Sequence, residues 1–340
     1  MPELRKDPII NRWVIIATER ARRPSDYIHH HSAEHLEKPV SCSFCPGKEH
    51  ETPPEVMAYR QAGTRPDTPG WWIRAVPNKF PALSPAMSDF NRKGHGMYDM
   101  MNGVGVHEVI IETPDHNLTI AQMPIRQVQE ILWAYRDRFL DLMTDQRIRY
   151  ILIFKNHGAS AGASLSHPHS QLIATPIVPR RVAEELEGSR AYYNFKERCV
   201  FCDVITQELL LKERIILENN NFIAIQPFAA RFPFETWIIP KRHSATYHNI
   251  DKNQIMDLAL ILKGTLAKLY KALDDPPFNY ILHTAPFPRW DEYGSFYHWH
   301  IEIMPRLTLV AGFEWGTGMY INPTPPEVAA NELAKIEVEI

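Results

Sequence analysis

The 340-residue sequence lacks a long hydrophobic run, an apolar start and a strong net charge. A membrane-spanning helix needs about 20 consecutive apolar residues, and no stretch approaches that length. The first residues, MPELRKDPIINRW, lack the apolar core of a secretion signal, and a formal net charge of −3 argues against general binding to nucleic acid. We therefore expect a cytoplasmic protein that binds neither membranes nor nucleic acid.

Cysteine is scarce: the chain has four, and all belong to two CxxC pairs, CSFC (Cys42, Cys45) and CVFC (Cys199, Cys202). Disulfides are unusual in the cytoplasm, which leaves metal ligation or redox chemistry for such pairs. A thioredoxin-like redox motif needs its CxxC at the start of a helix, and we expect neither pair to be placed so. The pairs therefore predict metal binding, with reduced structural thiols as the alternative.

The same motifs occur in the same order in the two halves of the chain. Each half has a CxxC pair, an isolated histidine, a long amphipathic helix, a strand and an HxH motif. A shift of 127 residues carries the apolar stripe of the first helix onto that of the second. The first half has CSFC, His116, a helix at 125–144, a strand at 150–156 and His167-Pro-His169; the second has CVFC, His243, a helix at 251–273, a strand at 280–287 and His298-Trp-His300.

Short β-rich runs supply the other secondary-structure signals, while the region 46–100, rich in proline, glycine and polar residues, is expected to be irregular. Strands flanked by one long helix per half predict an α+β fold with a mainly antiparallel sheet. The two halves are expected to meet within residues 185–198. Strands are expected at 11–18, 107–113, 150–155, 170–178, 221–226, 234–240 and 300–305.

The repeat predicts one zinc site in each half. Zinc prefers four sulfur and nitrogen ligands, and two cysteines with two histidines are a common structural set. Two cysteines separated by two residues can reach one ion from a tight turn, and the repeat supplies histidines at matching places. The predicted ligands are Cys42, Cys45, His116 and His167 in the first half, and Cys199, Cys202, His243 and His298 in the second.

The segment SHPHSQ places His167, His169 and Gln171 at alternating positions, and alternating residues of an extended chain face the same side. With His167 on a metal, His169 is held in one position, as nucleophilic catalysis requires. An unprotonated imidazole can attack phosphorus, and Gln171 offers an amide donor to a phosphate oxygen. Backbone amides and serine hydroxyls of the small-residue run 157–164 can approach phosphate closely.

These features predict His169 as a nucleophile toward phosphorus. The alternative is a polar loop that caps a strand. A rival nucleophile is His300 in HWHIE, which lacks both the preceding small-residue loop and the following glutamine. We therefore prefer His169.

SHPHSQ, together with CSFC and TPDH upstream, resembles the galactose-1-phosphate uridylyltransferase family of the histidine-triad superfamily, over nearly the whole chain. The resemblance implies a histidine-triad-like unit in each half. Residues 1–185 carry the catalytic HPH motif, and residues 186–340 carry the second metal site and a sugar-phosphate segment. It also implies the same first zinc set, His169 as the nucleophile and Gln171 as a phosphate contact.

Four other segments resemble the substrate-binding stretches of that family. The implied contacts are Arg20 and Arg23 in NRWVIIATERARRP (nucleotide phosphates), Asn78 and Phe80 in VPNKFPAL (nucleotide), Asn156 and Ser164 in KNHGASAGAS (nucleotide phosphates), and Glu314 in AGFEWGTGMYINP (a sugar hydroxyl).

The resemblance implies a ping-pong reaction with UDP-hexose and hexose 1-phosphate as substrates. His169 attacks the α-phosphorus of UDP-glucose and releases glucose 1-phosphate, and galactose 1-phosphate then takes the UMP group. Positioning and charge stabilisation dominate such transfers. The resemblance further implies a homodimer with the active site near the interface.

The second half departs from part of the family, where a glutamate and three histidines hold the second metal. The matching residues here are Glu185, His283, His298 and His300. The CVFC pair and His243 instead resemble a branch with two Cys₂His₂ zinc sites, which includes plant ADP-glucose phosphorylase-like proteins. The alternative function is therefore phosphorolysis of ADP-glucose through an adenylyl-histidine. A non-catalytic, zinc-stabilised nucleotide-binding protein is a third reading.

Overall fold

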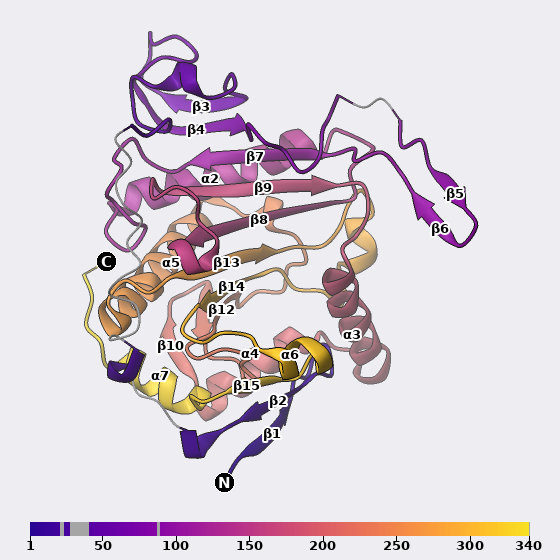
Figure 1. Cartoon of the computed structure of the whole chain (residues 1–340). Coiled ribbons are helices and arrows are strands. Elements are labelled where there is room, and N and C mark those ends of the chain that lie inside the picture. Colours follow the sequence, from indigo (N-terminus) through magenta and orange to yellow (C-terminus); the bar gives the residue numbers. More distant parts are fainter. Residues whose placement is uncertain (21–23, 28–40, 87–88, 340) are drawn as a thin grey trace.

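Figure 1 shows the computed structural model of the chain, which describes residues 1–20, 24–27, 41–86 and 89–339. The main sheet contains β3 (Met57–Arg60), β4 (Trp71–Pro77), β7 (Val106–Ile111), β8 (Tyr150–His157), β9 (His169–Thr175), β10 (Ile215–Glu218), β11 (Phe222–Ile225), β12 (Thr236–Pro240), β13 (Phe278–His283) and β14 (His300–Pro305). These ten strands lie in the order β10-β11-β12-β14-β13-β8-β9-β7-β4-β3, and all neighbours are antiparallel.

Two smaller sheets and several helices surround this main sheet. A three-stranded sheet contains β1 (Glu3–Lys6), β2 (Trp13–Ile16) and β15 (Tyr320–Asn322), and a hairpin contains β5 (Lys93–His95) and β6 (Tyr98–Met100). The α-helices are α2 (Ile125–Leu142), α3 (Arg180–Lys196), α4 (Val200–Leu211), α5 (Lys252–Leu273), α6 (Gly312–Thr317) and α7 (Pro326–Ala334). Short 3₁₀ turns are η1 (Thr18–Arg20), η2 (Glu49–Glu51), η3 (Ala159–Ala161), η4 (Tyr247–Asn249) and η5 (Trp290–Tyr293). Within the described residues, every helix is too short or too polar to cross a bilayer.

The two halves of the chain meet at the centre of the main sheet, where β8 pairs antiparallel with β13. Phe154 lies opposite Ile281 in this register, and the two residues are 127 positions apart, which is the shift that relates the halves of the sequence. The pairing therefore places a local two-fold axis between them. On either side the next strand begins at an HxH motif, β9 beside β8 and β14 beside β13. The predicted α+β fold with two repeated halves is confirmed.

The long helices α2 and α5 pack against each other on one face of the sheet (Figure 1). Their predicted apolar stripes are buried in the core, as Val128 and Phe139 of α2 and Leu258 of α5 illustrate. The second helix begins with a capping box at Asp251. Asp251 Oδ1 accepts the backbone N–H of Gln254 at 2.9 Å, and Gln254 Oε1 accepts that of Asp251 at 3.0 Å.

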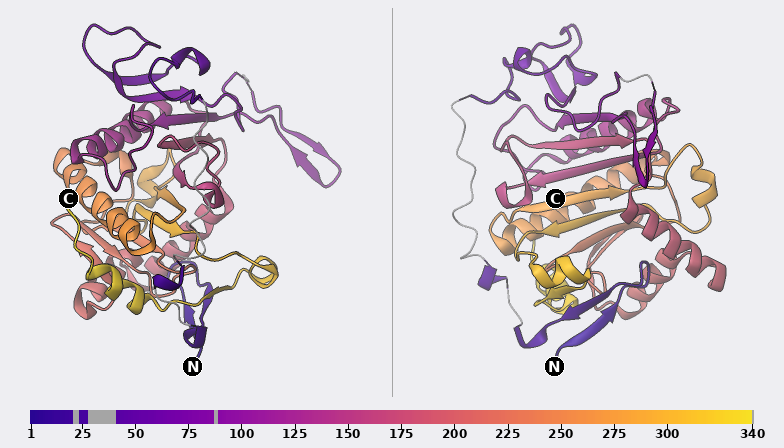
Figure 2. Two further views of the ribbon diagram at one scale, coloured as in Figure 1. Left: turned by 60° about the vertical axis from the view of Figure 1, so that its left-hand side comes forward. Right: turned by 45° about the vertical axis from the view of Figure 1, so that its right-hand side comes forward.

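The other face of the sheet carries the polar residues of the HxH motifs. Along β9, Leu172 and Ala174 pack into the core with the helices, so the alternating His169 and Gln171 face the opposite side. In the second half, α3 and α4 cover this opposite face, where Phe201 packs with Ile223 and Ile239. Figure 1 and the left view of Figure 2 show the β5–β6 hairpin projecting away from the sheet.

Each strand predicted from the sequence is present near its expected range, but the expectation for residues 46–100 was partly wrong. In that region β3 and β4 extend the edge of the main sheet, and β5 and β6 form the hairpin. The prolines and glycines lie mostly in the turns between these short strands. Their number hides the alternating pattern of β4 in the sequence, where Ile73 and Ala75 are buried. The expected junction at 185–198 falls mainly within α3.

Candidate active site and metal centres

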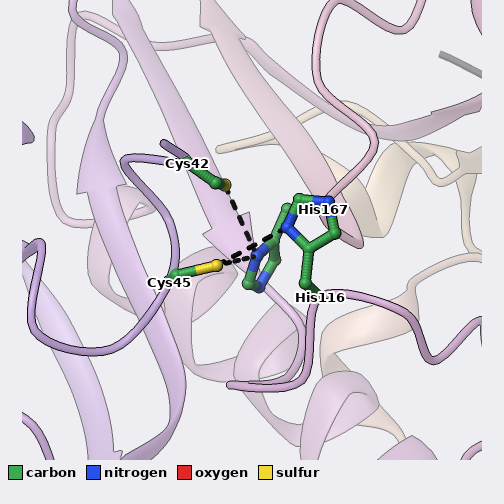
Figure 3. Close-up of side chains that lie close together, drawn as sticks. All are labelled: Cys42, Cys45, His116 and His167. Carbon is green, nitrogen blue, oxygen red and sulfur yellow. Dashed lines mark hydrogen bonds between the residues drawn. The ribbon is translucent and has the colours of Figure 1, made fainter. Parts of the chain in front are cut away.

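The four residues of the first predicted metal set converge in space (Figure 3). The cysteines come from the loop before β3, where Cys45 N–H donates to Cys42 O at 3.1 Å in a tight turn. His116 follows β7, and His167 lies two residues before the start of β9. His167 Nδ1 lies 3.7 Å from Cys42 Sγ and 3.6 Å from Cys45 Sγ, and His116 Nδ1 lies 3.5 Å from Cys45 Sγ.

These separations fit four ligands around one tetrahedral ion. Zinc–sulfur bonds of about 2.3 Å and zinc–nitrogen bonds of about 2.0–2.1 Å give a sulfur-to-nitrogen edge of about 3.6 Å. The far side of the His167 ring is also satisfied, because Nε2–H donates to Thr113 O at 2.8 Å. Donation from Nε2 leaves Nδ1 unprotonated, so its lone pair faces the sulfur atoms. Burial also lowers the pKa of His167 to about 4, which keeps the ring neutral.

The second predicted set has the same arrangement. His298 Nδ1 lies 4.0 Å from Cys199 Sγ and 3.7 Å from Cys202 Sγ, and His243 Nδ1 lies 3.4 Å from Cys202 Sγ. Both rings donate from Nε2 to backbone carbonyls, His243 to Gly294 at 2.7 Å and His298 to Pro240 at 2.8 Å. The sequence therefore identified two sets of Cys₂His₂ side chains that can each hold a metal ion.

One expectation about the cysteines was wrong. Cys199 is the N-cap of α4 and Cys202 lies in its first turn, so the CVFC pair does begin a helix. The Cys199 side chain makes no capping hydrogen bond, and cysteine is not among the preferred N-cap residues, so the sequence carried no start signal here. Both thiols are free and lie against His298, which is the ligand arrangement of the first set rather than a redox motif.

The alternative second metal set consisted of one glutamate and three histidines. Its members other than His298 form a separate cluster. Glu185, His283 and His300 each bring a potential ligand atom within 4.8 Å of the others. His283 Nδ1 lies 3.2 Å from Glu185 Oε2, and its Nε2 lies 3.5 Å from Glu302 Oε2. Burial disfavours the charged ring, but these two carboxylates outweigh it and raise the pKa of His283 to about 10. The structure therefore groups His298 with the cysteines and not with Glu185, His283 and His300.

His169 begins β9 beside the first metal set and is 6% exposed. Its Nδ1–H donates to the carbonyl oxygen of His167 at 2.7 Å, so the lone pair is on Nε2. Burial lowers the pKa of His169, and the nearby Lys155 ammonium lowers it further. The ring of Phe44, from the CSFC loop, approaches the imidazole at 5.4 Å between centroids. The CSFC loop and the backbone of the HxH motif therefore both orient a neutral imidazole whose Nε2 is unprotonated.

The rival His300 lies in a different environment. Its Nδ1 also donates to a backbone carbonyl, that of His298, at 3.1 Å, but its ring stacks on His283 at 4.6 Å. The residue two places along β14 is Glu302, whose carboxylate is bound by Arg231. An incoming phosphate would face this carboxylate, so the geometry favours His169 as the nucleophile.

Gln171, two residues beyond His169, is held by His107 of β7. His107 Nε2 lies 2.9 Å from Gln171 Oε1 and 3.1 Å from Asn78 Nδ2. Asn78 Oδ1 in turn accepts the backbone N–H of Phe80 at 2.9 Å, and the Phe80 side chain is 83% exposed. The structure thus brings three of the sequence-predicted contact residues, Gln171, Asn78 and Phe80, together around a histidine.

The small-residue run between β8 and β9 forms a tight loop beside this site. Gly158 has a φ of 82°, and an added Cβ there would lie 2.8 Å from a Pro277 atom. Asn279, from the second half, donates to Asn156 Oδ1 at 2.8 Å and to Ala161 O at 2.7 Å. Ser164 is exposed on this loop. The second half therefore ties Asn156, near the end of β8, to the loop that carries Ser164.

Behind β9, on the face covered by α2, lies a buried polar network. Lys155 Nζ donates to Glu112 Oε2 at 2.6 Å and to the carbonyl oxygen of His169 at 3.1 Å. Ser170 Oγ donates to Glu112 Oε1, and Tyr135 OH lies 2.5 Å from Ser170 Oγ. The Lys155 and Glu112 side chains are 3% and 0% exposed. The network holds the backbone of the HPHSQ segment from behind.

One predicted contact residue, Glu314, is not brought into this group, and two others fall at or beyond the edge of the described residues. Arg23 lies outside the described residues, and only the backbone of Arg20 is described, at the end of η1. Glu314 lies in α6, where its Oε2 accepts the backbone N–H of Ala311 at 3.1 Å. Helix α6 contacts β15, on the side of the molecule away from β7 and β9 (Figure 1).

The sequence analysis missed His107, Lys155 and Glu112. The sequence carries only a weak signal for each of them. Each is a polar or charged residue within or next to a run of strand-forming apolar residues, HEVIIET or YILIFKN. A buried charge in such a place must be paired, but the partner is not evident from sequence spacing.

The chain is similar to proteins of known activity over its whole length. A family profile described as galactose-1-phosphate uridyl transferase, N-terminal domain, matches residues 1–179, and the C-terminal domain profile matches residues 185–334. The ADP-glucose phosphorylase of Arabidopsis thaliana is 40% identical over 339 residues, 99% of this chain and 93% of that protein. The galactose-1-phosphate uridylyltransferase of Thermotoga maritima is 33% identical over 347 residues, 100% of both. The crystal structure of an Arabidopsis thaliana ADP-glucose phosphorylase with bound ADP-glucose matches with a TM-score of 0.84 and 38% identity, covering 99% of this chain and 100% of that one.

Proposed function

The chain belongs to the galactose-1-phosphate uridylyltransferase family of nucleotidyl-transferring enzymes, and we propose that it transfers a nucleoside monophosphate from a nucleotide sugar through His169. The observation that carries this proposal is the His169 imidazole itself. It is buried, it is neutral, and it donates from Nδ1 to the His167 carbonyl, which leaves the Nε2 lone pair for attack on phosphorus.

In the first half-reaction, Nε2 of His169 forms a bond to the α-phosphorus, and the bond to the leaving hexose 1-phosphate oxygen breaks. In the second, a phosphate oxygen of the acceptor attacks the same phosphorus and the bond to Nε2 breaks. One diphosphate is exchanged for another, so no net hydrolysis is required. The NH₂ group of Gln171 and the backbone amides of the loop after β8 stabilise the charge on the phosphoryl oxygens.

The first candidate reaction uses UDP-glucose as donor and galactose 1-phosphate as acceptor. It is supported by the match of both family profiles and by the Thermotoga maritima relative. Exchange between two hexose 1-phosphates fits a site with an amide, rather than a proton donor, two residues after the nucleophile, because the covalent intermediate must survive until the acceptor arrives.

A second candidate, phosphorolysis of ADP-glucose by inorganic phosphate, is favoured by a specific observation. The 40% identical relative carries that activity in its name, and the solved structure with a TM-score of 0.84 contains ADP-glucose. The two reactions share the nucleophile and differ only in the nucleobase and in the acceptor.

The test is the mass of the intact protein after incubation with UDP-glucose and, separately, with ADP-glucose. The first candidate predicts a gain of one UMP from UDP-glucose that is lost when galactose 1-phosphate is added. A gain of one AMP from ADP-glucose alone, lost on addition of inorganic phosphate, would move the protein to the second candidate. Failure to form an adduct with either donor would contradict covalent transfer from these sugars and favour non-catalytic nucleotide binding.

Each Cys₂His₂ set is proposed to bind one zinc ion, which would act as a structural anchor for its HxH motif. We expect two zinc ions per chain by elemental analysis, and one in each of the variants Cys45→Ala and Cys202→Ala. Loss of the first ion frees His167 and is expected to slow adduct formation about 10- to 100-fold. A Cys45→Ala protein that still binds two zinc ions would contradict the assignment.

The proposal also includes a cytoplasmic homodimer. Glu314 is the implied contact of a sugar hydroxyl, yet α6 lies away from β9 within the chain (Figure 1). A second copy that presents its α6 to this site would complete it. The four cysteines form no disulfide, and their grouping as ligand sets fits a reducing compartment.

A further inference from the structure

We propose that His107 is a positioning residue that fixes the Gln171 side chain with its NH₂ group toward the phosphoryl group of the substrate. This inference rests on the proposed function, because it concerns how Gln171 meets the phosphate. His107 lies on β7, on the same face of the sheet as His169 and Gln171, and it is partly buried.

The ring of His107 accepts a hydrogen bond from one backbone group, and that bond fixes the tautomer of the ring. The backbone N–H of Ala82 donates to Nδ1 at 3.1 Å. A backbone N–H cannot be turned around, so Nδ1 must be the acceptor and carries no proton. In a neutral imidazole the proton is then on Nε2, which lies 2.9 Å from the side-chain amide of Gln171.

This tautomer determines the orientation of the Gln171 amide. An Nε2–H donor requires an oxygen opposite it, so Oε1 of Gln171 faces His107 and its NH₂ group faces away. Without that contact, the oxygen and nitrogen of the amide could exchange places by a simple rotation. With Oε1 toward the phosphate, a hydrogen-bond acceptor would face the negatively charged phosphate oxygens, which is unfavourable.

His107 also ties Gln171 to the segment that carries Asn78 and Phe80. The backbone N–H of Asn78 donates to His107 O at 2.8 Å, so this segment is bound to both the backbone and the ring of one residue. Asn78 Nδ2 lies 3.1 Å from His107 Nε2 but cannot donate to a nitrogen that carries a proton. Since Asn78 Oδ1 accepts from Phe80 N–H, the NH₂ group is the end of the Asn78 amide that faces His107.

The second half of the molecule provides an internal comparison. Val109 lies opposite Gln171 in the β7–β9 pair, as Trp237 lies opposite Glu302 in the β12–β14 pair. His107, two residues before Val109, therefore corresponds to Glu235, two residues before Trp237. There Arg231 binds both Glu235 and Glu302. The half that contains His169 thus has a neutral amide held by a neutral imidazole, whereas the other half has charged side chains at the equivalent positions.

The experiment is a double-mutant cycle on the single-turnover rate of adduct formation, measured by intact mass with whichever donor labels the native protein. His107→Phe preserves the ring shape but removes both hydrogen-bonding nitrogens, and we expect a 10- to 100-fold slower rate. His107→Gln keeps a donor near the Nε2 position and is expected to recover most of that loss. In a Gln171→Ala background, His107→Phe should have no further effect, because the residue acts through Gln171.

Multiplicative effects of the two substitutions would overturn the proposal, since they would mean that His107 acts independently of Gln171. A second measurement needs no activity. In protein labelled with ¹⁵N-histidine, long-range ¹H–¹⁵N spectra should show His107 protonated on Nε2 and not on Nδ1. A proton on Nδ1 would overturn the inference even if transfer occurs. A native protein that forms no adduct but shows the Nε2–H tautomer would instead contradict the proposed function.

Discussion

Replacing His169 by alanine is expected to reduce the rate of nucleotidyl transfer by at least about 1,000-fold. The variant removes the Nε2 lone pair that forms the bond to phosphorus, and the surrounding amides cannot substitute for it. The intact mass of the His169→Ala protein should therefore stay unchanged with a donor that labels the native protein. Exchange of a labelled hexose 1-phosphate into the nucleotide sugar should be lost in parallel.

The matched control is His300→Ala, at the equivalent position of the second half. His300 follows His298 as His169 follows His167, and it donates to the equivalent carbonyl at 3.1 Å. We expect this variant to form the adduct at a rate within a few-fold of the native rate. If His300→Ala abolished the adduct and His169→Ala retained it, the nucleophile would be assigned to the wrong half.

The two Cys₂His₂ sets could be predicted because rare residue types recur in a fixed order, while the role of His169 as nucleophile stays a prediction. The four cysteines and the isolated histidines occur in the same order in both halves. In each half, the two cysteines of the CxxC pair are close enough in sequence to bind one ion. The alternation in HPHSQ places His169 and Gln171 on one face of any extended segment. These inferences depend on local geometry and residue chemistry alone.

The contacts that orient these residues could not be predicted, because they depend on register between distant strands. His107 reaches Gln171 because Val109, two residues further on, lies opposite Gln171 in the β7–β9 pair. A shift of one residue would turn His107 to the helix-covered face, and nothing in HEVIIET excludes that shift. The partner of Lys155, 43 residues away along the chain, follows from the pairing of β9 with both β8 and β7.

Replacing Lys155 by methionine is expected to lower the free energy of unfolding by about 3–5 kcal/mol. The change removes the ammonium that lies 2.6 Å from Glu112 Oε2 and leaves a fully buried carboxylate without a cation. Unfolding in urea, with the zinc concentration held constant, measures the loss. The double variant Lys155→Met/Glu112→Gln has no unpaired charge, and we expect it to recover at least half of that loss.

The Lys155 variant is also expected to slow adduct formation in the molecules that remain folded, because Lys155 Nζ holds the carbonyl oxygen of His169 at 3.1 Å. The matched control is Arg138→Met. Arg138 forms a buried pair with Glu108 on the same face of the sheet, with both contacts at 2.7 Å. It should lose comparable stability, because it also leaves a buried carboxylate unpaired, while its adduct rate per folded molecule stays native. Equal slowing in the two variants would mean that Lys155 supports the fold as a whole and does not position His169.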